Sequence, residues 1–286
     1  MSGMPEDFDM KEHQLRPLRV ESYGGLIFGT FSDDVEPLAD YLGPEMRPWI
    51  DRVFHKPVRF LGTLRQRMKS NWKLYFENVK DPYHGHLLHL FHNSFNIGRP
   101  NMDVESALDQ RHGLHSAIVA VKTEKSKDTS IYKENTVTTF RDDATLQDME
   151  VIRIREEFEL PVTNQIQSIF PSLVVQQIHN SLAARQIVPK GPGEFELVFH
   201  LFGYEDDDDE LRDMRLLQAN LIGPAGYISM EDGEATELVQ AAVSPSGTDA
   251  ASMMLMGEGA PEGHRSLITE ELLRAFWRGY RDIMED

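Results

Sequence analysis

The sequence QIQSIF-PS-LVVQQI-HN-SLAARQIV-PKGPGE-FELVFHLFGY, residues 165–204, decides the fold. Four runs rich in Val, Ile, Leu and Phe are separated by Pro171, Asn180 and the Gly191–Gly193 turn. Apolar runs with short polar breaks are typical of β-strands joined by tight turns. The segment therefore predicts an antiparallel meander of four strands.

Helical and strand patterns flank this meander on both sides. We expect two short strands within Leu18–Phe31, paired around Gly24-Gly25, and another at Val58–Leu64. Helices are predicted at Pro37–His55 (divided by Gly43-Pro44), Asn71–His92, Leu211–Ala219, Glu231–Ala242 and Thr269–Met284. Met102–Gln147 is poorly periodic except for Ala117–Lys122, and it is predicted to be a long loop of the kind that forms a lid or binds a ligand. This order predicts an α+β fold, in which helices pack on one face of an antiparallel sheet.

The composition excludes several kinds of chemistry. The 286 residues include no cysteine, which leaves no disulfide, thiolate nucleophile or Cys-bound metal cluster among them. No apolar stretch reaches the roughly 18 residues that a membrane span requires. The N-terminus is acidic and polar and lacks the pattern of a secretory leader, so the cytoplasm is the expected location.

The chain is strongly acidic, with a net charge of −18. This charge argues against a nucleic-acid partner, because the phosphates would be repelled. The most acidic run, Glu205–Glu210, lacks the spaced ligands and the turn glycine of a calcium loop. It is predicted to be a solvated turn.

Histidines are concentrated in DPYHGHLLHLFH, residues 81–92. Four of the chain's 11 histidines lie there: His84, His86, His89 and His92. Neutral imidazole is a preferred ligand for iron, zinc and copper, although a histidine-rich exposed helix is an equally good interpretation. His84 and His89 are five residues apart, about 140° around an ideal helix, and would converge only if Pro82 and Gly85 bend the chain. Spacing alone therefore does not choose the ligands.

Two motifs resemble the iron-binding segments of one enzyme family. The first is N-x-x-D-x-Y-H-x-x-x-x-H, formed by Asn78, Asp81, Tyr83, His84 and His89. The second is GPAGY at Gly223–Tyr227, followed by Glu231-Asp232. Both resemble the catalytic domain of the large (alpha) subunit of Rieske non-haem iron aromatic-ring-hydroxylating oxygenases. The similarity is nearest to members that act on aromatic carboxylates such as terephthalate, salicylate and halobenzoates.

This resemblance implies a metal site and a fold. His84, His89 and Asp232 would bind one Fe(II), leaving positions open for dioxygen. Asp81 would join His84 to a Rieske-cluster histidine of a neighbouring subunit. The implied fold is the helix-grip type, an antiparallel sheet around a long C-terminal helix. From the residues alone, Ser229 and Asp232 also form a capping box for a helix, and this alternative stays open.

The resemblance further implies O2 and an aromatic, carboxylated substrate, which would be hydroxylated or cis-dihydroxylated. Arg185 and Arg274 are candidates to bind the carboxylate, because a guanidinium matches it with two parallel hydrogen bonds. Ordinary surface arginines are the alternative. Apolar walls of the site are expected from Phe170, Leu173, Val175 and Leu201.

The family also implies a domain arrangement. Residues 1–15 are predicted to be a flexible arm, and residues 16–286 the oxygenase catalytic domain. Because a [2Fe-2S] Rieske cluster needs Cys ligands, electrons would come from a Rieske centre or ferredoxin and a reductase on other chains. A homotrimer, or an α3β3 assembly with a small β subunit, is implied. The alternatives are a non-catalytic helix-grip protein that binds a hydrophobic small molecule, an inactive relic of the oxygenase, and a hydrolytic zinc site.

Overall fold

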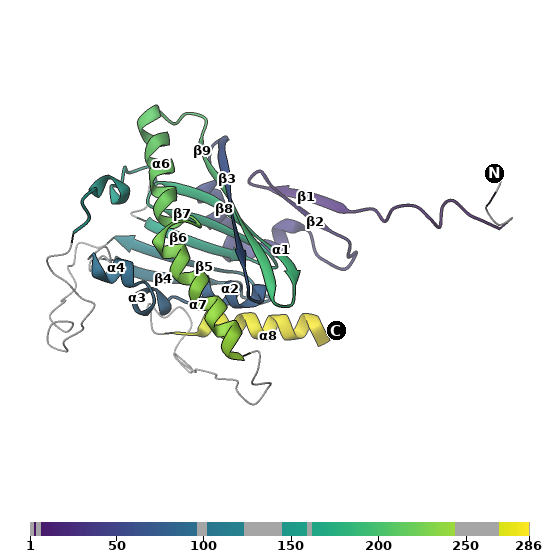
Figure 1. The fold of residues 1–286 in the computed structure, drawn as a ribbon. Helices are drawn as coiled ribbons and strands as arrows, with labels where there is room; N and C mark the ends of the chain where they lie inside the picture. The colour runs from purple at the N-terminus through teal and green to yellow at the C-terminus, as the bar shows by residue number, and fades with distance from the viewer. Residues whose placement is uncertain are drawn as a thin grey trace.

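The centre of the protein is an antiparallel β-sheet of seven strands (Figure 1). The computed structural model describes residues 3, 7–95, 102–122, 145–158, 162–243 and 269–285. Within this part, the strands lie in the order β3-β9-β8-β7-β6-β5-β4. Their bounds are β3 Val58–Met68, β4 Met102–Leu108, β5 Ser116–Lys122, β6 Val162–Ile169, β7 Leu173–Ile178, β8 Ser181–Gly191 and β9 Glu194–Tyr204. The predicted α+β class and the four-stranded meander, β6 to β9, are confirmed.

Two strands lie within the segment predicted to be a long loop. β4 pairs with β5 from Met102↔Lys122 to Leu108↔Ser116. The loop prediction was therefore wrong for β4, whereas β5 covers the periodic run Ala117–Lys122 that the prediction had set apart. β4 is an edge strand with the sequence MDVESAL, and its polar residues obscure the apolar alternation that would identify it. The remainder of the segment includes residues 123–144, which lie outside the described part of the chain.

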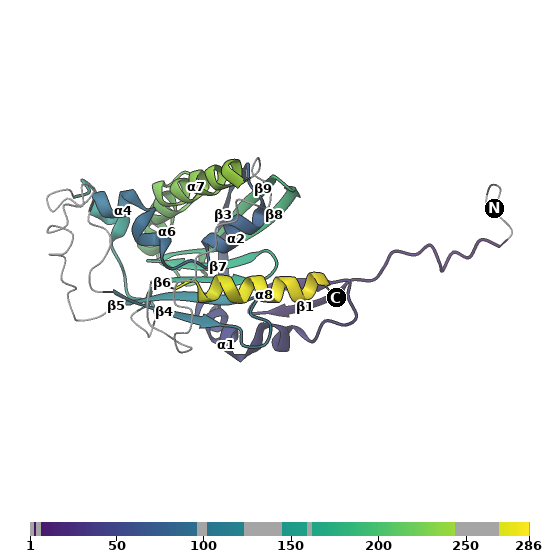
Figure 2. The same ribbon diagram turned by 90° about the horizontal axis from the view of Figure 1, so that it is seen from below.

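Alternating side chains of the strands form two cores on opposite faces of the sheet. The inner face, which carries Val174 and Ala183, packs against α2 (Trp72–Asn78) and α8 (Glu271–Glu285). The outer face, which carries Val175 and Leu182, packs against α1 (Leu38–Val53) and a hairpin of β1 (Arg19–Tyr23) and β2 (Leu26–Thr30). Figure 2 shows α1 on the side of the sheet opposite to α7 (Tyr227–Val243). The prediction that helices cover only one face was therefore wrong.

Two backbone breaks predicted from glycines are present. Gly24 and Gly25 have φ angles of 57° and 82° and form the turn between β1 and β2. Gly43, with φ 71°, interrupts α1 as expected, because a residue with a side chain rarely adopts this conformation.

The predicted helix Asn71–His92 is divided into α2, α3 (His84–Leu87) and α4 (Leu90–Ser94). Asn71 caps α2, since its side chain accepts a hydrogen bond from the backbone N of Lys73 at 3.1 Å. α2 ends before Pro82, whose ring disfavours helical conformation in the preceding residue. Asp81 then accepts a hydrogen bond from the backbone N of Tyr83 at 2.8 Å in the connecting turn. The prediction of a single continuous helix was therefore wrong, and the chain bends near Pro82 as expected.

A buried ion-pair cluster holds α6 (Asp209–Ile222) against the sheet. Arg215 is 1% exposed, and its Nε and Nη2 donate to Asp207 at 2.7 and 2.9 Å. The same guanidinium pairs with Glu157 and donates to the carbonyl of Asn180. The acidic run does contain the predicted turn, but the Asp207 side chain is only 6% exposed because Arg215 compensates its charge. The prediction that the whole acidic run is exposed to solvent was therefore wrong.

The C-terminal helix α8 packs on the inner face, which confirms the helix-grip arrangement. Phe276 is fully buried, with its ring 5.2 Å from that of Phe76 in α2. Gly279 lies so close to the backbone that a Cβ there would be 2.1 Å from the carbonyl oxygen of His112. Among the described residues, no helix combines the length and apolar character of a bilayer span.

The N-terminal arm is described at residue 3 and from residue 7 onward, where the chain runs away from the sheet (Figure 1). The flexibility of residues 1–15 stays a prediction. A short 3-10 helix, η1 (Met149–Ile152), precedes β6 and packs near α6.

Candidate metal centre

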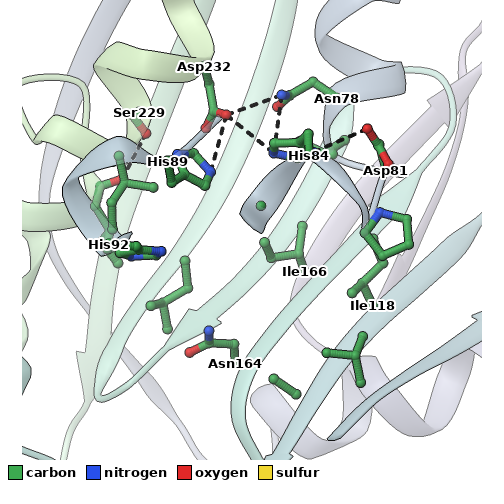
Figure 3. Close-up of a pocket in the computed structure, with 18 of the residues that line it drawn as sticks. Asn78, Asp81, His84, His89, His92, Ile118, Asn164, Ile166, Ser229 and Asp232 are labelled. Atoms are coloured by element: carbon green, nitrogen blue, oxygen red, sulfur yellow. Dashed lines mark hydrogen bonds and ion pairs between the residues drawn. The ribbon is translucent and has the colours of Figure 1, made fainter. Parts of the chain in front are cut away.

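His84, His89 and Asp232 come together beside the inner face of the sheet (Figure 3). His84 begins α3, His89 lies between α3 and α4, and Asp232 lies on α7. The Nε2 atoms of His84 and His89 lie 3.4 and 3.6 Å from the same Oδ1 of Asp232. One donor atom from each residue lies within 4.8 Å of the other two. The division of the predicted helix is what makes the two histidines converge, with their ring centroids 5.3 Å apart.

A carboxylate also lies beside the Nδ1 atom of each imidazole. Asp81 Oδ2 is 3.5 Å from His84 Nδ1, which is within ion-pair distance but longer than an ordinary hydrogen bond. Glu231 Oε2 is 3.0 Å from His89 Nδ1, and Glu231 Oε1 accepts a hydrogen bond from the backbone N of Phe91 at 3.0 Å. Carboxylates in this position fix the orientation of a ligating imidazole. The contact of Glu231 was not predicted, because no sequence spacing relates it to His89.

Asp232 is oriented by Asn78, the last residue of α2. The side-chain amide of Asn78 donates to Asp232 Oδ1 at 3.1 Å. Ser229 lies inside α7, which begins at Tyr227, and its hydroxyl donates to the carbonyl of Ile222 at 2.9 Å. The capping-box interpretation of Ser229 and Asp232 was therefore wrong, and Asp232 is free to face the histidines.

The carboxylates around His84 favour its protonated, positively charged form. Burial opposes protonation of His84, but the carboxylates of Asp232 and then Asp81 outweigh it and raise the pKa of His84 to about 10. Burial likewise opposes ionisation of Asp232, but the hydrogen bond from His84 and the charge interaction with His89 hold its pKa below the ordinary value. A buried carboxylate needs such a compensating charge nearby.

The three side chains fit a divalent transition metal. Two donors about 2.1 Å from one ion and at right angles to each other lie about 3 Å apart, close to the observed separations of 3.4 and 3.6 Å. Two His and one carboxylate on one side of an ion form the facial triad of non-haem Fe(II) oxygenases, and zinc accepts the same set. In the described part of the chain, these residues form the only such group of three.

The other histidines of the cluster lie outside this group. The side chain of His86 lies outside the described part of the structure. His92 lines the adjoining cavity, with its ring centroid 5.4 Å from that of His89. His179, which the sequence did not single out, lines the same cavity from the turn after β7 and has a positive φ of 52°.

A cavity of about 200 Å³ lies between the metal-binding side chains and the sheet (Figure 3). Its floor is formed by strand residues that alternate toward the inner face: Val104, Ile118, Ala120, Asn164, Ile166 and Ile178. None of the four residues that were expected to form apolar walls of the site lines this cavity. Leu173 and Val175 belong to the outer-face core, whereas Phe170 and Leu201 pack in the inner core outside the cavity lining.

The two predicted substrate arginines differ in their positions. Arg185 on β8 lines the cavity and is 4% exposed, and its Nη1 donates to the hydroxyl of Tyr75 at 2.7 Å. Its guanidinium also lies over the ring of Phe199, 5.1 Å from the centroid. Arg274 on α8 is not among the described residues that line this cavity.

Residues 53–286 match the family described as ring hydroxylating alpha subunit (catalytic domain). The chain belongs to this family. It is 58% identical over 285 residues to the anthranilate 1,2-dioxygenase large subunit of Burkholderia cepacia, covering 99% of this chain and 67% of the relative. It is 44% identical to the terephthalate 1,2-dioxygenase terminal oxygenase subunit alpha 2 of Comamonas sp., covering 99% of this chain and 68% of the relative. The ring-hydroxylating oxygenase catalytic domain inferred from the two motifs is confirmed.

Two solved structures of low sequence identity share the fold. Naphthalene 1,2-dioxygenase from Rhodococcus sp., bound to indole, aligns with a TM-score of 0.72 at 22% identity, over 99% of this chain and 71% of that one. A quaternary ammonium Rieske monooxygenase aligns with a TM-score of 0.63 at 13% identity, over 99% and 66% of the two chains. The ring-hydroxylating chain described here contains no Cys, so no Cys-ligated Rieske cluster is held by these 286 residues.

Proposed function

We propose that His84, His89 and Asp232 hold a single Fe(II) for ring hydroxylation. The observation that carries this proposal is the convergence of three donor atoms within 4.8 Å in a chain of the ring-hydroxylating family. When bound, the iron supplies the redox chemistry that activates O2. The protein's part is to leave one side of the triad facing the cavity, and to hold each imidazole through Asp81 and Glu231.

The substrate we propose is a single-ring aromatic carboxylate. The relatives named for anthranilate, terephthalate and salicylate all act on compounds of this kind. A cavity of about 200 Å³ is smaller than the roughly 300–1,000 Å³ of pockets for drug-sized ligands, and most of the strand residues that line it are apolar. Arg185 supplies a buried cation beside these walls to pair with the carboxylate. Arg274, which does not line the cavity, has no role in this proposal.

Electrons are proposed to arrive from a Rieske centre outside these residues. Asp81 lies beside the Nδ1 atom of His84 and is partly exposed, so it is suited to contact a partner on its other side. A ferredoxin or reductase would supply that centre, and a trimer with or without a small β subunit is the proposed assembly.

Metal analysis after anaerobic Fe(II) loading tests the proposed site. We expect about one iron per wild-type chain, and loss of this iron in His84→Ala and Asp232→Ala. His92→Ala is the matched control, because His92 lines the cavity but lies outside the donor group. Iron retained by both ligand variants would disprove the site.

Oxygen consumption separates an oxygenase from a zinc hydrolase or a non-catalytic binding protein. With a Rieske partner, a reductase and NADH present, uptake of O2 should depend on an added aromatic acid. Uptake that ignores the aromatic acid, or hydrolysis supported by zinc alone, would contradict the proposed reaction.

A further inference from the structure

Arg185 is a buried cation in apolar surroundings. It lies on β8 between Val174 of β7 and Phe199 of β9, which are its cross-strand partners and are both fully buried. Only 4% of Arg185 is exposed, and no carboxylate of the described residues forms an ion pair with it. A guanidinium in such a place has several rotamers and no anion that selects one of them. Another group must therefore hold it in one orientation beside the cavity.

Tyr75 of α2 provides that contact. Its hydroxyl accepts a hydrogen bond from Arg185 Nη1 at 2.7 Å, the only hydrogen bond of this guanidinium within the described part of the chain. Arg185 Nε is buried without a partner, so one part of the guanidinium is anchored while another is left for a ligand. Burial raises the pKa of Tyr75, so its hydroxyl stays neutral at pH 7 and leaves the charge of Arg185 uncompensated. A carboxylate in the cavity would supply the missing charge.

The same face of α2 also orients the metal-binding carboxylate. Tyr75 and Asn78 are three residues apart, so their side chains lie on one side of the helix. Asn78 donates to Asp232 Oδ1 at 3.1 Å (Figure 3). One helix thus joins the candidate metal centre to the cation that is proposed to bind the carboxylate. The position of this cation relative to the metal decides which ring carbon faces the metal.

We infer that Tyr75 is a positioning residue, which fixes the guanidinium of Arg185 for the carboxylate of the substrate. The inference rests on the proposed aromatic-carboxylate function and adds to it a residue that does not touch the substrate. Tyr75 is not among the described residues that line the cavity, so its effect must pass through Arg185. Without the hydroxyl, the guanidinium would occupy its binding orientation for only part of the time, and the apparent affinity for a carboxylate would fall by that fraction.

Calorimetric titration of the Fe(II)-loaded chain under anaerobic conditions tests the inference. The probes are benzoate and benzamide, which have nearly the same shape but differ in charge. Wild-type protein should bind benzoate at least about tenfold more tightly than benzamide. Tyr75→Phe should reduce this preference about tenfold, since a hydrogen bond to a charged group is lost, and should change the benzamide affinity by less than about twofold. The bound iron should be unchanged, because Asn78 still orients Asp232.

A double-mutant cycle shows whether Tyr75 acts through Arg185. Arg185→Met should abolish the preference for benzoate, and adding Tyr75→Phe to it should change the benzoate affinity by less than about twofold. Tyr204→Phe is the matched control, because this buried tyrosine donates to the carbonyl of Val53 in the outer core. The control should keep the wild-type preference, and thermal melting verifies that each variant is folded.

Specific results would overturn the inference. They are an unchanged preference in Tyr75→Phe, an equal loss of both affinities, a loss of iron in this variant, and additive losses in the double variant. Failure of the underlying function is distinguishable, because the wild-type chain itself would then show no preference for benzoate over benzamide.

Discussion

Replacement of Arg215 by Met should be the most destabilising change of a single charge on α6. Its guanidinium lies between Asp207 and Glu157, whose side chains are 6% and 9% exposed. Removing the cation leaves two carboxylates in a buried environment without compensation. Loss of one partner from a buried ion pair typically costs about 3–5 kcal/mol, and we expect Arg215→Met to fall in this range.

Arg212→Met is the matched control on the same helix. Arg212 pairs with Asp209 at 2.6 Å, but the Asp209 side chain is 88% exposed, so the pair is screened by water. Its removal should change the free energy of unfolding by at most about 0.5 kcal/mol. Urea unfolding at pH 7, followed by circular dichroism, measures both variants.

The difference between the two variants should also depend on pH. Although burial opposes it, hydrogen bonding from Arg215 holds the pKa of Asp207 below its unfolded value of 3.8. The stability from this pair is thus fully present above pH 3.8 and is lost as the pH falls through the lower folded pKa. If Arg215→Met costs no more than Arg212→Met at pH 7, the buried cluster does not hold α6 in place.

Three other perturbations test separate parts of the structure. Glu231→Gln should weaken Fe(II) affinity about 10–100-fold in a chelator competition, whereas Glu234→Gln, an exposed position on the same helix, should not. Burial lowers the pKa of Lys80 to about 7, so the unfolded chain binds more protons above this pH. Between pH 7 and 10, the free energy of unfolding of the wild-type chain should rise by roughly 3 kcal/mol relative to that of Lys80→Met in urea titrations, because the opposite contribution of His84, whose pKa is raised, is common to both proteins. Gly279→Ala should lower stability by about 1–3 kcal/mol in the same assay, although this change usually stabilises helices, because the new Cβ would meet the carbonyl of His112 at 2.1 Å.

Local patterns predicted most of the fold. The meander β6 to β9 was evident because each run of apolar residues ends at a residue that favours a turn. Gly43 divided α1 where expected, since its positive φ is rare for other residues. β4 was missed because its alternation of apolar and polar residues covers only Met102–Glu105 and is broken by Ser106 and Ala107.

The faces of the buried strands could not be predicted in the same way. β7 is buried on both sides, so its sequence LVVQQI has no polar–apolar alternation that distinguishes them. Val175 was expected in the cavity wall but faces α1, whereas Gln176 lies on the inner face of the sheet. Only the position of α1 on the outer face settles this choice, and that position depends on contacts far apart in the sequence.

The candidate metal centre was predictable in its residues but not in its surroundings. The resemblance selected His84, His89 and Asp232, and the structure brings them together by bending the chain near Pro82. The hydrogen bond between Glu231 and His89 joins residues 142 positions apart. No periodicity in either segment encodes such a contact, because it arises from the packing of α7 beside α4.

The cavity has a helical roof that carries the metal-binding side chains and a β-sheet floor that carries Asn164, Ile166 and Ile118. This separation means that different side chains determine reactivity and substrate choice. A floor residue such as Ile118 can be exchanged for a smaller or larger one without moving any of the three metal-binding side chains. Enzymes for new ring compounds can therefore diverge from this scaffold by substitutions in the four neighbouring strands β4 to β7 that form the floor.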